Sequence, residues 1–175
     1  RCVGALAEYA RFLREPREAR EFAFHWRQGA DPEGEAIVAA ALAEGRDALL
    51  EHEAKRLVAM HGVPVPRDVL AETADAAAEA AGAVGGPVAL KLVSPQILHK
   101  SDAGGVALGL TGGGEVRSAF DEIVRSAREY DPFAEIRGVL VSPMAAPGVE
   151  VIVGTKTDDQ FGPVILFGIG GVLVE

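Results

Sequence analysis

Cysteine and aromatic side chains are scarce in this sequence of 175 residues. Cys2 is its one cysteine, which excludes a disulfide within the chain and a cysteine-rich zinc site. Because disulfides are typical of oxidising compartments, we expect a cytoplasmic protein. Aromatic residues make up 6% of the sequence, whereas hydrophobic residues as a whole make up 49%. We therefore expect one sizeable core that is built mainly from aliphatic side chains.

An excess of positive charge is also lacking. The chain has 17 lysines and arginines against 26 aspartates and glutamates, a formal net charge of -9. A general nucleic-acid binder or a binder of anionic membranes would carry a basic face, so we expect neither partner. An anionic ligand would need a local cluster of positive side chains.

Long apolar runs are missing as well. No stretch approaches the roughly 18 apolar residues that a membrane-spanning helix needs. Residues 1–13 have neither the apolar centre nor the small-residue cleavage site of a signal peptide. The sequence thus predicts no membrane partner.

Several common catalytic motifs are absent. There is no G-x-x-x-x-G-K-[ST] loop and no G-x-G-x-x-G after a strand, because residues 168–171 are too short a glycine cluster. His52 and Glu53 do not begin a zinc-protease motif, since Arg56 stands where the second histidine would be. No G-x-S-x-G is present, so a hydrolase nucleophile elbow is unsupported.

The first 34 residues differ in composition from the rest. Apolar residues at helical spacing predict an amphipathic helix over residues 3–13. Phe22, Phe24 and Trp26 are either a strand-like run, a patch that contacts another domain, or local core. Residues 28–34, QGADPEG, have the composition of a linker. Since the chain begins without methionine and stops inside a strand-like run, we expect it to be a piece of a longer protein.

Helical and strand patterns alternate in the remainder of the chain. Helices are predicted over residues 35–44, 50–61, 72–81 and 116–127, and strands over 87–93, 106–110, 136–141, 149–155 and 163–167. The last two strands are joined by KTDDQFG, a plausible hairpin loop in which Asp158 and Asp159 cap the turn. This mixture predicts an α/β or α+β domain with a mixed sheet flanked by helices.

A lysine in the middle of an apolar strand is the first candidate binding residue. Lys91 stands in PVALKLV, and its neighbours on the same strand face are the small residues Ala89 and Val93. A charge on a buried strand needs a partner, because desolvating an unpaired ammonium is costly. A lysine that extends from a strand edge into water would show the same pattern.

The turn after this strand, HKSDAGG, is the second candidate. Lys100 and Ser101 lie beside Gly104 and Gly105, which permit positive φ and let main-chain N–H groups approach phosphate oxygens. A glycine-rich hairpin turn is the alternative. His99 in neutral form is a usable nucleophile toward phosphorus, although a lone loop histidine is more often simply solvated.

Three further charged residues are candidates with weaker support. By period two, Glu150 and Lys156 share a strand face, which could border a cleft or form a surface pair of little energetic value. Glu175 ends an apolar run, and its carboxylate is a possible Mg²⁺ ligand.

Four segments together resemble the ATP-grasp domain of NDP-forming acyl-CoA synthetases. They are PVALKLVSPQILHKSDAGGVALGL, GVLVSPM, GVEVIVGTKTDDQFGPVILFGIGGVLVE and, upstream, LLEHEAKRLVAMHGVPVP. The H-K-S-D-x-G-G-V and D-x-x-F-G-P segments are specific in combination. The similarity is to the ADP-forming acetyl-CoA synthetase group, which is related to succinyl-CoA synthetase β subunits, and it covers residues 35–175. Residues 1–34 resemble the helical tail of an upstream CoA-ligase domain plus a linker.

The resemblance implies that acyl-CoA, phosphate and ADP interconvert with a free acid, CoA and ATP through a phosphohistidine. It implies ATP or ADP and Mg²⁺ as ligands. It also implies a CoA-binding and phosphohistidine domain as partner, in the same chain or a separate subunit, and a possible homo-oligomer. An ATP-grasp site closes between two subdomains, so this chain would hold an incomplete ATP-grasp fold and would be inactive alone.

The resemblance also assigns roles to individual residues. His99 aligns with a phosphate-relay histidine, and Glu175 with a carboxylate near the metal. The nucleotide-binding positions are Lys91, Lys100, Ser101, Gly104, Gly105, Val141, Met144 and Glu150, where residues 141–144 match the hinge beside the adenine. The sequence departs from the usual hinge at Ser142 and Pro143, because the proline removes one backbone donor.

Three alternatives remain open from the sequence. The chain could be a regulatory synthetase-like region of a protein lysine acetyltransferase, without catalysis. It could be an ATP-grasp ligase that joins a carboxylate to an amine, although the HKSDAGG loop argues against this. It could also be an interaction domain that binds no nucleotide.

Overall fold

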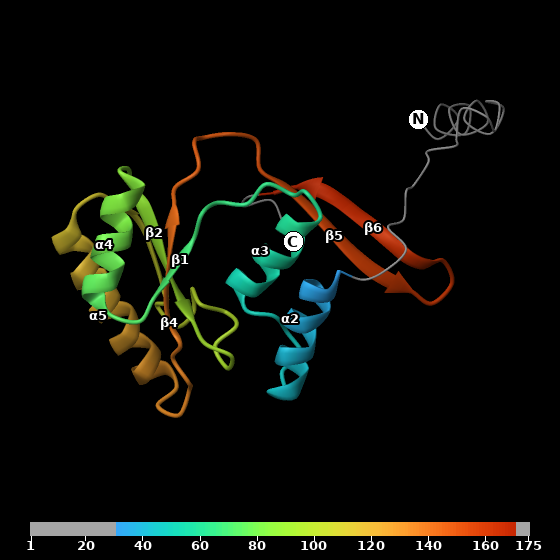
Figure 1. Ribbon diagram of the computed structural model, residues 1–175, viewed down its shortest axis with the longest axis horizontal. Coiled ribbons are helices and arrows are strands. Elements are labelled where there is room, and N and C mark those ends of the chain that lie inside the picture. Colours follow the sequence, from blue (N-terminus) through green and yellow to red (C-terminus); the bar gives the residue numbers. More distant parts are fainter. Residues whose placement is uncertain (1–30, 171–175) are drawn as a thin grey trace. The chain divides into compact units, whose positions relative to one another are not determined.

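The computed structural model of the chain describes residues 31–170 (Figure 1). The predicted helix over 3–13, the aromatic run at 22–26 and Glu175 lie outside these residues. The chain divides into two compact units, Arg1–Gly45 and Arg46–Glu175. The division of function between 1–34 and 35–175 stays a prediction.

Helix α2 (Pro32–Ala43) is the described part of the first unit. It begins three residues before the predicted helix because Asp31 caps it: the Asp31 side chain accepts a hydrogen bond from the Glu33 N–H at 2.9 Å. Pro32 is suited to a first helical position. Gly45, with φ of 72°, follows its end.

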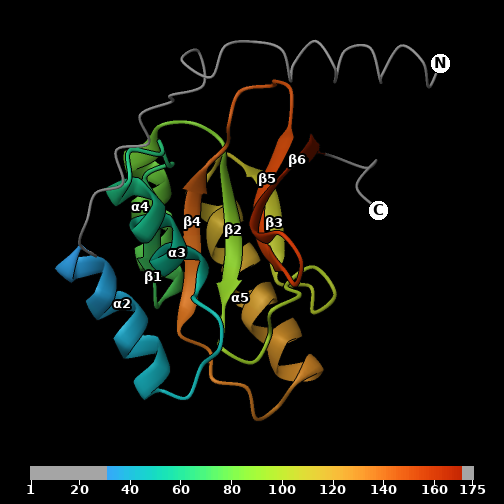
Figure 2. The same ribbon diagram turned by 90° about the vertical axis from the view of Figure 1, so that its right-hand side faces the viewer.

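The second unit is built around a four-stranded sheet in the order β1-β4-β2-β3. Its elements are α3 (Glu51–Met60), β1 (Val69–Ala71), α4 (Ala74–Val84), β2 (Val88–Val93), β3 (Val106–Leu110), α5 (Gly113–Tyr130) and β4 (Gly138–Pro143). Figure 2 shows β2 between β4 and β3. The α/β class is confirmed, and three-residue β1 is the strand that the sequence did not predict.

The expected mixed sheet is wrong in its strand directions: every pairing among these four strands is antiparallel. The reason lies in the connections. Helix α4 joins β1 to β2, which run parallel but are separated by β4. Helix α5 likewise joins β3 to β4, which are separated by β2. The two crossovers are therefore interleaved, and no parallel pair becomes adjacent.

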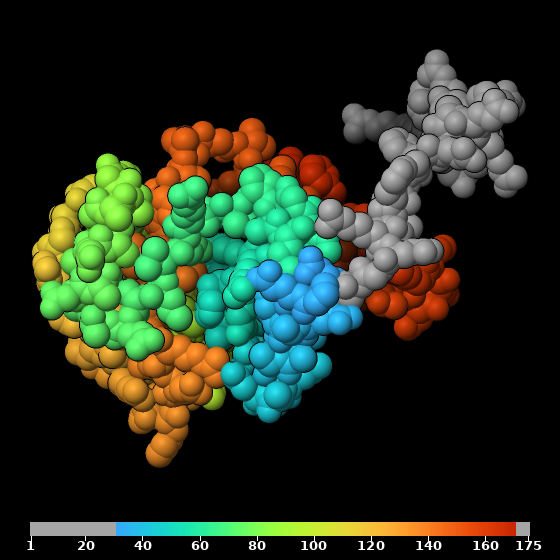
Figure 3. All heavy atoms as spheres, in the orientation of Figure 1, coloured from blue at the N-terminus to red at the C-terminus, as the bar shows by residue number. Residues whose placement is uncertain are grey.

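The main core lies between the sheet and helices α4 and α5. On β2 the side chains of Val88, Leu90 and Leu92 are fully buried in it. The two helices pack against each other and against β2 or β4, and their surfaces are continuous in the space-filling view (Figure 3). Since side chains alternate along a strand, Lys91 belongs to the opposite face of the sheet, on which α3 lies (Figure 1).

A separate two-stranded sheet follows, formed by β5 (Val151–Asp158) and β6 (Gly162–Ile169). The predicted hairpin is confirmed, with both strands longer than expected. The Asp158 side chain closes the turn, because its Oδ1 accepts hydrogen bonds from the N–H groups of Gln160 and Phe161. Large apolar side chains stay exposed on both strands, among them Val153, Ile165 and Phe167.

Local caps explain the shifted boundary of another predicted element. Helix α4 begins at Ala74 rather than near residue 72 because Thr73 caps it, accepting from the Ala76 N–H at 3.2 Å.

Within residues 31–170, no helix combines the length and apolar character required to span a bilayer.

Candidate functional site

Two lysines converge on one carboxylate on the α3 face of the sheet. The Lys91 Nζ donates to Oε1 of Glu51 at 2.6 Å, and the Lys100 Nζ donates to Oε2 at 2.5 Å. Lys91 lies in the middle of β2, Lys100 in the loop after β2, and Glu51 is the first residue of α3. The two lysines that the sequence marked as candidates therefore meet at one point in the structure.

A third lysine completes this cluster. Lys55, one helical turn after Glu51, donates to Glu51 Oε1 at 2.9 Å and to Asp68 Oδ2 at 2.5 Å. The Asp68 side chain is 7% exposed, and the three lysine side chains are 21–30% exposed. Three ammonium groups thus face two carboxylates, so the cluster keeps one net positive charge although the chain as a whole is acidic.

The lysines dominate the electrostatics of Glu51. Burial by itself would raise the pKa of this carboxyl, but hydrogen bonds from Lys100, Lys91 and Lys55 outweigh burial and lower its pKa to about 2. For Lys55, burial would lower the pKa of the ammonium, and its bonds to Asp68 and Glu51 raise it instead. Glu51 is therefore ionised at every pH near neutrality.

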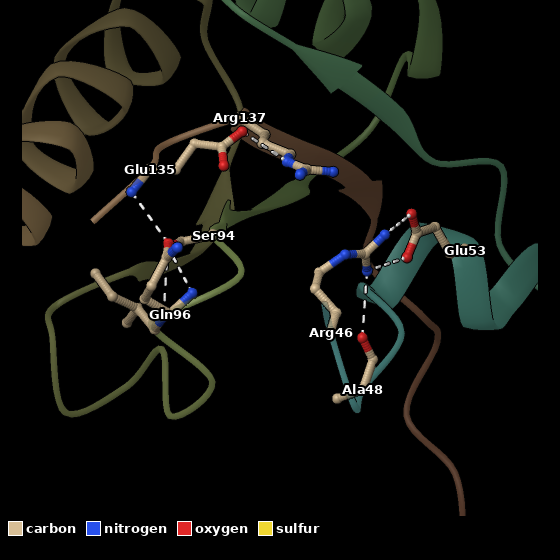
Figure 4. A network of polar contacts seen from close by, with 8 residues as sticks. Arg46, Ala48, Glu53, Ser94, Gln96, Glu135 and Arg137 are labelled. Atoms are coloured by element: carbon tan, nitrogen blue, oxygen red, sulfur yellow. Dashed lines mark hydrogen bonds and ion pairs between the residues drawn. The ribbon is translucent and has the colours of Figure 1, made fainter. Parts of the chain in front are cut away.

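Helix α3 is attached to the sheet mainly through this cluster. None of its own residues is buried. The preceding residue, Leu50, forms a small apolar cluster with Val93 and Leu140. Figure 4 shows how the start of the helix is fixed: Arg46 donates two hydrogen bonds to Glu53, at 2.7 and 2.8 Å. Glu53 also accepts from the Leu50 N–H at 2.8 Å.

The loop that carries Lys100 is anchored at its beginning. Ser94 Oγ accepts hydrogen bonds from the N–H groups of Gln96 and Ile97 at 3.3 Å. Gln96 Oε1 in turn accepts from the Glu135 N–H at 3.0 Å (Figure 4). Ile97 is 3% exposed in the main core. The beginning of the loop that carries Lys100 is thus packed against the rest of the domain.

The glycine turn is closed by its own hydrogen bonds. The Gly105 N–H donates to the Lys100 carbonyl at 2.7 Å, and the Gly104 N–H donates to the Ser101 carbonyl at 3.2 Å. Gly104 has φ of 64°, and a Cβ on Gly105 would lie 2.9 Å from Leu92 Cβ. In this conformation both amides are engaged within the turn, and the glycines place Lys100 rather than offer free donors.

A cavity of about 300 Å³ adjoins the cluster. Its walls are apolar, and the charged groups of Glu51 and Lys100 stand beside them; the lining is completed by Leu49, Leu50, Val93, Ser94, Ile97 and Leu98. The cavity thus has an apolar wall and an edge formed by Glu51 and Lys100, which belong to a cluster of net positive charge; this suits a ligand with both apolar and anionic parts.

The predicted hinge residues lie at the end of β4. Val141 is buried in the core on the helix side, so it faces away from Lys91. Ser142, paired with Ala89, lies on the Lys91 face, and its buried Oγ has no hydrogen-bond partner among the residues described. The Met144 N–H donates to the Pro87 carbonyl at 3.0 Å, and Pro143 has no N–H to donate.

Three other predicted residues are not joined to the lysine cluster. His99 and Ser101 are exposed beside Lys100. Glu150 is exposed just before β5, in the other sheet from Lys91.

Glu51, Lys55 and Asp68 are the members of the site that the sequence did not predict. A weak signal was present, because Glu51 and Lys55 are four residues apart on a predicted helix and can pair there. Such pairs are common on solvated helix faces. Their connection to Lys91 depends on the fold bringing the start of α3 within hydrogen-bond reach of β2, which the sequence pattern alone does not contain.

Metal binding has no support in the described part of the chain. Residues 31–170 contain no group of three or more histidine, cysteine, aspartate or glutamate side chains placed to hold an ion. The proposed ligand Glu175 is not among them.

The fold described above is that of a known domain family. The ATP-grasp domain family matches residues 40–175, and the chain belongs to that family. It is 50% identical over 139 residues to the β subunit of ADP-forming acetate–CoA ligase II of Pyrococcus furiosus, covering 79% of this chain and 59% of that protein. It is 47% identical to the ADP-forming 4-hydroxybutyrate–CoA ligase of Nitrosopumilus maritimus, covering 75% of this chain and 19% of that one.

Solved structures of related proteins have the same fold. The crystal structure of PH1788 from Pyrococcus horikoshii superposes with a TM-score of 0.77 at 48% identity, covering 80% of this chain and 60% of that one. Acetyl-coenzyme A synthetase 1 of Ca. Korarchaeum cryptofilum, in complex with coenzyme A and Ca-AMPCP, superposes with a TM-score of 0.76 at 45% identity, with coverages of 79% and 61%. The chain therefore spans about three fifths of the length of these two structures and of the Pyrococcus furiosus subunit, and about one fifth of the Nitrosopumilus maritimus ligase.

Proposed function

We propose that Lys91 and Lys100 bind the phosphates of ATP or ADP, and that the chain is the nucleotide-binding part of an ADP-forming acyl-CoA synthetase. The observation that carries this proposal is the convergence of both ammonium groups on the two oxygens of Glu51. Phosphate oxygens accept the same charge-assisted hydrogen bonds as a carboxylate. The apolar cavity beside them and the relatives' names support the same function.

In the whole protein, acyl-CoA, phosphate and ADP would interconvert with a free acid, CoA and ATP. Phosphoryl transfer depends mostly on positioning and on neutralising charge, and the two lysines would supply that charge. Ser101 would add a hydroxyl donor, with Gly104 and Gly105 shaping the turn. Residues 141–144 would border the base, and Glu150 would contribute from the position just before β5. Because the Met144 N–H is already bonded, base contacts would use other groups of the hinge.

Two parts of the proposal depend on groups that residues 31–170 do not contain. His99 would relay phosphate between the nucleotide and a separate CoA-binding and phosphohistidine domain, in the same chain or another subunit. Mg²⁺, when bound, would neutralise phosphate charge; Glu175 is its proposed ligand.

A cytoplasmic location and a homo-oligomer belong to the same proposal. The relatives reported above are ligases, and nothing in residues 31–170 favours a non-catalytic acetyltransferase region.

The decisive experiment is Lys91→Ala in the full-length protein that contains this chain. Losing a charged hydrogen bond should weaken ATP binding by roughly 1.5–3 kcal/mol. Isothermal titration calorimetry measures this directly. Arg125→Ala, which removes an exposed cation from α5, is the control and should leave the ATP affinity nearly unchanged. Equal ATP affinity in the Lys91 variant and the wild type would remove Lys91 from the site.

A further inference from the structure

Each cluster lysine keeps donors that Glu51 does not use. An ammonium group carries three N–H donors, and Lys91 and Lys100 each give one to Glu51. Their side chains are 30% and 21% exposed, so the remaining donors can reach a ligand from solvent. Glu51 therefore holds the two ammonium groups together without using all of their N–H donors.

Glu51 is itself held in place from the opposite side. Lys55 binds the same carboxylate and is fixed in turn by the nearly buried Asp68. The backbone of Glu51 begins α3, whose start is secured by Arg46 and Glu53. The carboxylate is thus a fixed point to which two flexible lysines are tied.

We propose that Glu51 is a positioning residue for phosphate binding: it orders Lys91 and Lys100 at a common point before the nucleotide arrives. This inference rests on the proposed function of the two lysines. Long lysine side chains lose much rotamer freedom when they are fixed. If Glu51 has already fixed them, a polyphosphate binds without that cost, which is the general benefit of preorganisation.

If charge alone mattered, the loss of Glu51 would change the ATP affinity in the opposite direction. Removing the charge of Glu51 raises the net charge of the cluster, so a polyphosphate should then bind more tightly. The same result is expected if Glu51 merely competes with phosphates for the lysines. The sign of the change in affinity therefore separates positioning from competition.

The test measures AMP and ATP affinity by calorimetry in the full-length protein and in its Glu51→Gln variant. A glutamine has the same shape but offers one acceptor oxygen, and its NH₂ group faces the second ammonium. We expect ATP to bind about tenfold more weakly, as for the loss of a charged hydrogen bond, while AMP changes less than about twofold. The preference for ATP over AMP should narrow accordingly.

Glu122→Gln is the control, since it removes the same charge from an exposed ion pair with Arg125 on α5 and touches none of the three lysines. It should leave both thermal stability and the ATP-to-AMP preference nearly unchanged. If Glu51→Gln does not fold, Glu51→Asp replaces it: its shorter carboxylate cannot reach both lysines, so the same narrowing is expected.

The outcomes are distinguishable. Unchanged or tighter ATP binding in the folded Glu51 variant overturns the positioning role, as does an equal loss for AMP and ATP. If Lys91→Ala still weakens ATP binding in that case, the proposed function stands. If the wild type does not prefer ATP over AMP, the proposed function and this inference both fail.

Discussion

At the scale of single residues, the structure links side chains that are 40 and 49 positions apart in the chain. Glu51 is bonded to Lys91 and Lys100 over those separations. The two lysines were predictable, because a charge in an apolar strand and a cationic glycine turn are unusual. Glu51 was not, since a glutamate on an amphipathic helix is normally solvated. Its role differs because the fold brings the start of α3 within hydrogen-bond reach of β2, which is a tertiary feature.

The lysine cluster should make stability depend on pH through Glu51. Its folded pKa of about 2 lies below the ordinary 4.5, so the stabilisation is fully present above pH 4.5 and is lost as pH falls toward 2. By linkage it amounts to at most about 3 kcal/mol. Urea unfolding of the wild type and Glu51→Gln from pH 7 to 2 measures it. The difference between them should shrink over that window; a constant difference would contradict the assignment.

At the scale of elements, the spacing of apolar residues and the turn residues predicted most helices and strands of the second unit. Strands β2 and β3 match their predicted ranges within one residue, and the β5–β6 hairpin is present. The predicted helices were right in kind, and capping residues shifted their ends. Strand β1 was not predicted because a strand of three residues is too short to show an alternating pattern. Strand directions could not be predicted either, since the interleaving of the two crossovers is a property of three dimensions.

The close approach of β1 to β4 depends on Gly138. Its φ is 134°, and a Cβ there would lie 2.4 Å from the Ala71 carbonyl oxygen. We expect Gly138→Ala to lower the free energy of unfolding by roughly 2–4 kcal/mol, because strain and a backbone collision combine. Gly109→Ala is the control: φ is 73° with open space around it, so only about 1–2 kcal/mol should be lost. Equal losses in denaturant titrations would show that the collision relaxes.

At the scale of the whole molecule, stability should be distributed unevenly over the described residues. Strands β2 and β4 are central in the sheet and largely buried, whereas β5 and β6 form a two-stranded sheet with exposed side chains. We expect amides of β2 and β4 to exchange with deuterium far more slowly than those of β5 and β6. Mass spectrometry of peptic fragments measures this. Equal protection in the two sheets would contradict the expectation.

The interleaved crossovers set the order in which the sheet can close during synthesis. Val69 of β1 pairs with Val141 of β4, so the earliest strand has no neighbour until the ribosome has released the latest one of the four. A nascent chain that stops before Gly138 would expose a strand edge on β2 and leave β1 without a partner. Strands β2 and β3 can pair earlier, but the sheet is completed only when β4 enters between β1 and β2, so its closure is a late event in synthesis.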